Sequence, residues 1–225
     1  MITHMRFRRG LLAMALAASL SIVWTQEAQA SPVIVVIPVS QFAYANTNNM
    51  NNNVTTDGMI APGDPSPAAP IMRVGNDTTG NVYRGFMRFQ LAGTGVSGQV
   101  LSVSLLGRLD HSWSCNPRPT SFYRTAPITV TPRQSWPGPA LQVPLGTAQV
   151  NANESLCAQS NDSFDVTTGQ LLSDVQMVVN AQMPAYYVGV SARDLVSGAN
   201  ESASDRWMRY FLNDFRLQIV FEPPV

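Results

Sequence analysis

The sequence predicts an all-β protein, a jelly-roll-like antiparallel β-sandwich of about nine strands with one short helix. Apolar and polar residues alternate with a period of two in several segments, which is typical of strands that bury one face. Clusters of Gly, Pro, Asn and Ser separate these segments, and only one segment has its apolar residues at helical spacing. Many short strands with turn-rich connections favour packed antiparallel sheets.

The first strand is expected from Ile34 to Tyr44, a segment that is rich in Val and Ile and interrupted by Pro38. A long surface loop is expected over residues 46–70, because six of the eight residues from Asn46 to Asn53 are asparagine and Thr, Pro, Ala and Gly follow. Such a composition cannot bury enough apolar surface to order itself. A loop of this length inside a compact domain is either mobile or functional.

The alternation is clearest in two segments, Tyr83–Leu91 and Gln99–Leu109. In the second, Leu and Val occupy most odd positions and Ser and Arg most even ones, which predicts one buried and one solvated face. Further strands are expected at Ile71–Val74, Ser121–Thr125, Leu141–Val150, Ser163–Val166, Tyr186–Ala192, Trp207–Leu212 and Phe215–Phe221. The helix is expected from Thr168 to Gln182, because its Leu and Val residues recur at three- and four-residue spacing and Pro184 follows.

Residues 1–30 are expected to be a signal peptide. Three arginines precede an apolar stretch from Leu11 to Trp24, and Ala28-Gln29-Ala30 is a small-x-small cleavage pattern. The apolar stretch is shorter than the roughly 20 residues that a transmembrane helix needs, so no membrane insertion is expected after cleavage. The mature chain, residues 31–225, is then expected to be a secreted single domain.

The mature chain has eleven arginines, no lysine and thirteen acidic residues, a net charge of −2. This balance gives no basic patch of the kind that nucleic acid or an anionic membrane attracts, so neither is an expected partner.

Two cysteines and one histidine occur in the mature chain, and Cys115 lies four residues after His111. A Cys–His dyad needs the two side chains within hydrogen-bonding distance. The preceding period of two indicates a strand, in which four residues span roughly 13 Å. An exported chain with two cysteines therefore favours a disulfide between Cys115 and Cys157 over a nucleophile.

Other chemistry has little support in the sequence. His111 has no second histidine or spare cysteine with which to bind a metal, and no Gly-x-Ser-x-Gly motif occurs. Asp162–Asp165 and Asn76–Thr78 supply oxygen atoms for a structural Ca²⁺ without matching a calcium loop, so no cofactor is expected. Paired carboxylates for glycoside hydrolysis stay open at Asp110, Asp162, Asp165, Asp194 and Asp205. We nevertheless expect a protein without catalytic activity.

Several motifs resemble secreted bacterial domains of the DNRLRE type, which are related to carbohydrate-binding-module β-sandwiches and are common in actinobacterial extracellular proteins. The matching residues are Tyr83–Phe89, His111–Cys115, Phe122–Thr125, Ile128, Ser135-Trp136, Cys157, Phe164–Thr167, Gly189-Val190, Glu201 and Trp207. The chain departs from the pattern at Gln90, where the family has Asp, at Phe215, where it has Pro, and by lacking the six-letter motif that names the family. The resemblance implies a non-catalytic jelly roll with bridged cysteines, associated with polysaccharide or the cell surface.

Sugar recognition by such a domain needs exposed aromatic rings beside polar groups. Tyr123 is expected to point outward if Phe122 points inward, and would then lie beside Arg118 or Arg133. Trp136 lies in a Pro- and Gly-rich segment that could expose its ring. Trp113 and Trp207, in contrast, alternate with polar residues and are expected in the core.

These observations predict a secreted binding module for extracellular or cell-surface polysaccharide, with Tyr123 and Trp136 as the stacking candidates. The alternative is a structural or adhesive envelope protein whose partner is another protein, bound through sheet edges or the Asn-rich loop.

Overall fold

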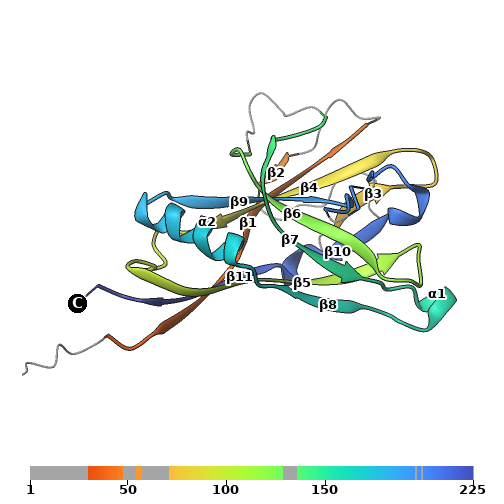
Figure 1. Ribbon diagram of the computed structural model, residues 1–225. Helices are drawn as coiled ribbons and strands as arrows, with labels where there is room; N and C mark the ends of the chain where they lie inside the picture. Colours follow the sequence, from red (N-terminus) through yellow and green to blue (C-terminus); the bar gives the residue numbers. More distant parts are fainter. Residues whose placement is uncertain are drawn as a thin grey trace, which may run out of the picture.

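The computed structural model describes residues 30–47, 54–56, 71–128, 136–195, 197–198 and 200–224 (Figure 1). The strands are β1 (Val33–Asn46), β2 (Val54–Thr56), β3 (Ile71–Asn76), β4 (Val82–Gln90), β5 (Gln99–Ser112), β6 (Arg118–Thr125), β7 (Leu141–Val150), β8 (Asp162–Val166), β9 (Ala185–Ser191), β10 (Met208–Phe211) and β11 (Arg216–Glu222). The helices are α1 (Glu154–Cys157), α2 (Gly169–Asn180) and the short 3-10 helices η1 (Ser204–Arg206) and η2 (Leu212–Asp214). The all-β prediction is confirmed, with more strands than expected.

Six strands close into a ring in the order β1, β11, β5, β10, β3 and β4, and β4 pairs again with β1. The ring closes because several strands change partners along their length, among them β1 and β3. Residues 33–38 of β1 pair with β11, and residues 39–46 pair with β4. Likewise, β3 pairs first with β10 and then with β4. The prediction of a clear sandwich of two separate sheets is thus corrected to a closed six-strand barrel.

The remaining strands extend this ring into two layers. Strands β9, β6 and β7 continue outward from β4, and β8 pairs with the edge of β5 that β11 leaves open. Figure 1 shows β4, β9 and β6, which belong to the upper layer, crossing above β5, β8 and β11, which belong to the lower layer, with α2 toward the left. Within the expected loop, residues 54–56 form β2, which pairs with β1. The rest of that loop from residue 48, and residues 1–29 of the expected signal peptide, lie outside the described residues.

Inward side chains of both layers form one core. Phe89 and Phe122 contribute from the upper layer, and Leu105 and Leu109 from β5, all of them fully buried. On β5, Leu105 and Leu109 alternate with half-buried or exposed residues, so the period of two places both side chains on the same face of the strand.

Helix α2 closes one end of the core with its apolar face. Leu171, Val175 and Val178 are buried, and the Thr168 hydroxyl accepts a hydrogen bond from the Leu171 N–H at 3.0 Å. The predicted helix is therefore present, two residues shorter at its C-terminal end. The single turn of α1, capped by Asn153, was not expected.

The turn between β3 and β4 is built around the Asp77 carboxylate. Its two oxygens accept hydrogen bonds from the Thr79 amide and hydroxyl, the Asn81 amide and side chain, and the Tyr83 hydroxyl, at 2.7–3.1 Å. Burial opposes ionisation, but the hydrogen bonds from Thr79 and Asn81 outweigh it and hold the pKa of Asp77 at about 2.

We expect this turn to contribute a pH-dependent share of stability. A carboxyl whose pKa is lowered by folding stabilises the folded state above its unfolded pKa near 3.8, and that share is lost as the pH falls toward 2. The Asp77→Asn variant should therefore lose less unfolding free energy between pH 4 and pH 2 than the wild type does. We expect a difference of about 1 kcal/mol, because solvent screens this accessible turn. Urea unfolding at several pH values measures it, and equal losses in both proteins would contradict it.

Candidate functional site

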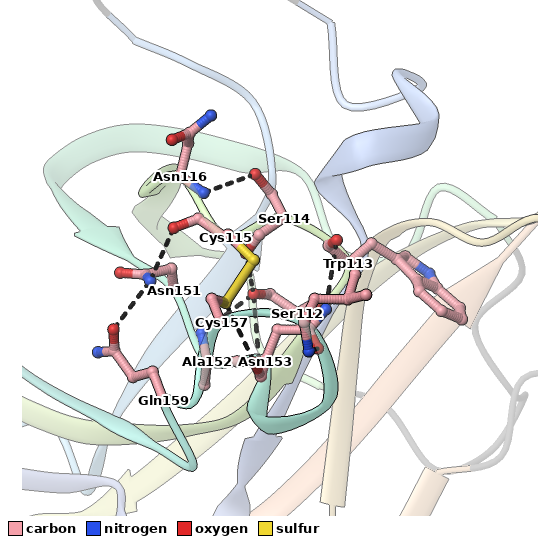
Figure 2. The surroundings of a disulfide bond; sticks show 11 residues. Ser112, Trp113, Ser114, Cys115, Asn116, Asn151, Ala152, Asn153, Cys157 and Gln159 are labelled. Atoms are coloured by element: carbon pink, nitrogen blue, oxygen red, sulfur yellow. Dashed lines mark hydrogen bonds between the residues drawn. A yellow bond between two sulfur atoms is a disulfide. The ribbon is translucent and has the colours of Figure 1, made fainter.

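Cys115 and Cys157 form a disulfide, with their Cα atoms 5.7 Å apart, as predicted from the sequence. The bond ties the β5–β6 connection to α1, and Figure 2 shows hydrogen bonds on both sides of it. The Ser112 N–H donates to the Ala152 carbonyl at 2.5 Å, and the Asn153 side chain donates to the Ser112 carbonyl at 2.9 Å. Because the Cys115 sulfur is bonded to Cys157, it is not a nucleophile that His111 could activate.

A β-bulge just before this disulfide determines which way the next side chains point. Strand β10 pairs Tyr210 with Leu109 and Arg209 with His111, so Asp110 is an extra residue on β5. A bulge shifts the alternation by one position. Leu109 is therefore buried, His111 lies on the outer face and Ser112 is fully buried again.

Three aromatic rings meet on the outer surface next to the bulge, and we call His111, Trp113 and Trp207 the aromatic cluster. The Trp113 and Trp207 ring centroids are 5.4 Å apart, and the His111 ring lies 5.8 Å from each. Trp113 is 42% exposed, and Figure 2 shows its ring directed away from the disulfide. Trp207 is half-buried, and its backbone carbonyl accepts a hydrogen bond from the Trp113 backbone N–H at 3.3 Å.

The expectation that both tryptophans lie in the core is thus wrong. The bulge at Asp110 reverses the alternation and so directs Trp113 outward. Trp207 lies just before β10 instead of within it. The bulge depends on pairing with a strand about a hundred residues away, so no local signal in the sequence reveals it.

Polar groups border the aromatic cluster. Arg209 forms an ion pair with Asp110, and its backbone is paired with His111 across the two strands. Burial, followed by the charge of Arg209, lowers the pKa of His111, and Asp110 partly offsets this. At neutral pH the imidazole is therefore uncharged and offers one N–H donor and one lone pair.

Tyr123 and Trp136, the two stacking candidates from the sequence, lie on the outer side of the upper layer. Tyr123 does point away from the core, but it is only 6% exposed. Within the part of the chain that the structure describes, its buried hydroxyl has no hydrogen-bond partner. Trp136 is half-buried and packs against a small apolar cluster that contains Phe86. Tyr123 is therefore covered, whereas Trp136 keeps part of its surface exposed.

A buried ion pair lies under Trp136. The Arg84 guanidinium carbon is 4.8 Å from the Trp136 ring centroid, and Arg84 Nε donates to both Glu201 carboxylate oxygens at 3.0 and 3.1 Å. The Ser191 hydroxyl also donates to Glu201. The Glu201 side chain is buried and the Arg84 side chain is mostly buried, so this group is a structural ion pair within the layer.

The two arginine candidates do not join Tyr123. Arg118 forms an ion pair with Asp205 of η1, and the alternation along β6 places it on the opposite face from Tyr123. Arg133 lies outside the described residues.

The aspartates that were considered for hydrolysis all accept hydrogen bonds or ion pairs from neighbouring residues. Arg209 pairs with Asp110, Arg118 with Asp205, and the Asn151 amide donates to Asp162 at 3.0 Å. Thr167 donates to Asp165 at 2.9 Å, and Ser197 donates to Asp194. Among the described residues, no group of three or more His, Cys, Asp or Glu side chains gathers as a metal site would require.

A cavity of about 860 Å³ lies between the β4–β5 connection and the C-terminal end of α2. It is lined mostly by small and apolar residues, among them Gly93, Val96, Val179 and Pro184. The lining contains no aromatic ring and no charged side chain, and its polar side chains are those of Ser97, Asn180 and Gln182.

No family model matches this chain, and no curated protein is significantly similar to it. None of the helices in the described ranges is long and apolar enough to cross a membrane.

Proposed function

We propose that this protein is a secreted, non-catalytic module that binds extracellular or cell-surface polysaccharide through the aromatic cluster. The observation that carries the proposal is the exposed Trp113 ring held 5.4 Å from Trp207 on the protein surface. Indole rings stack on the apolar C–H faces of pyranose sugars, and adjacent polar groups bond the hydroxyls. Arg209 and Asp110 supply a donor and an acceptor at the edge of the cluster.

The disulfide supports this proposal because it makes the cluster rigid. Trp113 lies two residues from Cys115, and Ser112 is hydrogen-bonded to the segment that precedes α1. A binding ring that is already held in place loses little conformational entropy when a ligand binds. The proposed relationship to jelly-roll domains of the carbohydrate-binding type, and the proposed export, rest on the sequence motifs and on this bonded cysteine pair.

The proposal moves the site from Tyr123 and Trp136 to Trp113 and Trp207. Exposure favours Trp113, which is 42% exposed, over Tyr123, which is 6% exposed. The pairing of Trp113 with Trp207 favours the aromatic cluster over Trp136, which packs with Arg84 and Phe86 instead. The proposal that the protein is not an enzyme rests on the bonded cysteines and on the structural partners of its aspartates.

Trp113→Ala should weaken polysaccharide binding by about tenfold or more, because it removes the most exposed ring of the cluster. The measurement is depletion from solution by insoluble cellulose, chitin, xylan and starch, followed by binding isotherms on whichever is bound. Leu156→Ala is the matched control, since Leu156 is 72% exposed on α1 beside the same disulfide but carries no ring.

Equal affinity of Trp113→Ala and wild type would place the site elsewhere. Wild-type protein that binds no polysaccharide but sediments with envelope proteins would favour the alternative role, that of a structural or adhesive envelope protein.

A further inference from the structure

Among the described residues, the first half of β1 is paired on one side only. Residues 33–38 pair with β11, and the pairing of β1 with β4 begins at Val39. In the described portions of the chain, no strand pairs with the other edge of residues 33–38. Such an edge presents a row of unpaired backbone N–H and C=O groups, which can template another strand.

Residues 33–37, between Pro32 and Pro38, contain no charge, proline or bulge that would protect this edge against strand pairing. Val33, Ile34 and Val36 are 40%, 63% and 50% exposed, although the outer face of a half-buried strand is normally polar. No charged residue occurs from Ser31 to Gln41. Natural proteins usually protect such an edge with charged side chains, bulges or a covering segment.

We infer that residues 33–37 form a homodimer contact in which β1 pairs antiparallel with β1 of a second copy of this chain. Antiparallel pairing of a segment with itself is self-complementary about a two-fold axis. An uncharged apolar segment then meets an identical one, without the like-charge repulsion that destabilises facing strands. Pro32 and Pro38 lack an N–H and bracket the segment, so the pairing is short and its length is defined.

The geometry of the molecule leaves room for this contact. Ile34 is paired with Val220 of β11, so its exposed side chain continues an apolar row that the second copy would extend. Figure 1 shows the start of β1 at the opposite end of the molecule from α1, where the disulfide and the aromatic cluster lie. The contact therefore does not cover the proposed polysaccharide site, and the two proposals are independent.

The dimer should be weak. Five paired residues extend over only about 17 Å, so the contact should bury less than the roughly 800 Å² per partner of a stable interface. We therefore expect a dissociation constant in the micromolar range or above, and reversible dimerisation that depends on protein concentration.

Sedimentation velocity of the mature protein from about 1 μM to about 1 mM covers that range. The wild type should change from monomer to dimer with increasing concentration. Ile34→Lys should raise the dimer dissociation constant by about tenfold or more, because it places a charge on each side of the contact. Val36→Lys should have the same effect. Leu156→Lys, at a more exposed apolar position far from β1, should have none.

The circular dichroism spectrum and the depletion by polysaccharide should be unchanged in Ile34→Lys and Val36→Lys. These two controls test whether the fold and the aromatic cluster remain intact in the variants. A wild type that is monomeric throughout the range would overturn the inference. So would a dimer that persists unchanged in both lysine variants.

Discussion

Replacing both cysteines with serine is expected to lower the free energy of unfolding by about 4 kcal/mol. The disulfide closes a loop of 42 positions, and its removal lets the unfolded chain explore many more conformations. Urea unfolding of the wild type and of the Cys115→Ser/Cys157→Ser variant measures the difference.

The double cysteine variant should also bind polysaccharide more weakly. Trp113 is held by a segment that the disulfide ties to α1, so the ring becomes more mobile without that bond. Wild type treated with a reductant is the matched control, because it loses the same bond without a substitution. If the double cysteine variant loses less than about 1 kcal/mol of unfolding free energy, the surrounding hydrogen bonds alone hold this region.

Glu201→Ala is expected to destabilise the protein by about 3–5 kcal/mol, because it leaves the buried Arg84 guanidinium without its partner. Arg84 contacts Glu201 through two nitrogens and packs against Trp136, so its mostly buried charge has no other acidic partner among these contacts once Glu201 is removed. Ser191 also loses its acceptor. Thermal and urea unfolding of the variant and the wild type give the change.

Asp205→Ala is the matched control for Glu201→Ala. It breaks the ion pair with Arg118, whose two side chains are both partly exposed, and such pairs contribute about 1 kcal/mol or less. An apolar replacement of the buried pair, Arg84→Met with Glu201→Leu, should recover much of the stability that Glu201→Ala loses. Equal effects of Glu201→Ala and Asp205→Ala would contradict the assignment of Arg84–Glu201 as a buried structural pair.

Local patterns in the sequence were sufficient for most individual elements. The spacing of Leu171, Val175 and Val178 predicts α2, since residues three and four apart share one face of a helix. The alternation in β4 and β5 predicts two of the central strands for the same kind of local reason. The chain has only two cysteines, so a disulfide within it has only one possible pairing.

The candidate site could not be predicted in the same way. The alternation of polar and apolar residues around Trp113 and Trp207 predicted burial, and the loop around Trp136 predicted exposure. Long-range contacts instead leave Trp113 exposed and Trp136 half-buried. The bulge at Asp110 arises from pairing with β10, and Arg84 and Glu201, which lie beside Trp136, are 117 positions apart in the chain.

The sequence by itself determined that this is an all-β chain with one amphipathic helix and one disulfide, because periodicity and cysteine number are local or countable properties. Only the tertiary structure decided that β1 and β3 change partners to close a barrel, and that Trp113 and Trp207 meet on its surface. Strand partners, bulges and the exposure of a ring depend on which distant segments pair, and that is settled by the packing of the whole chain.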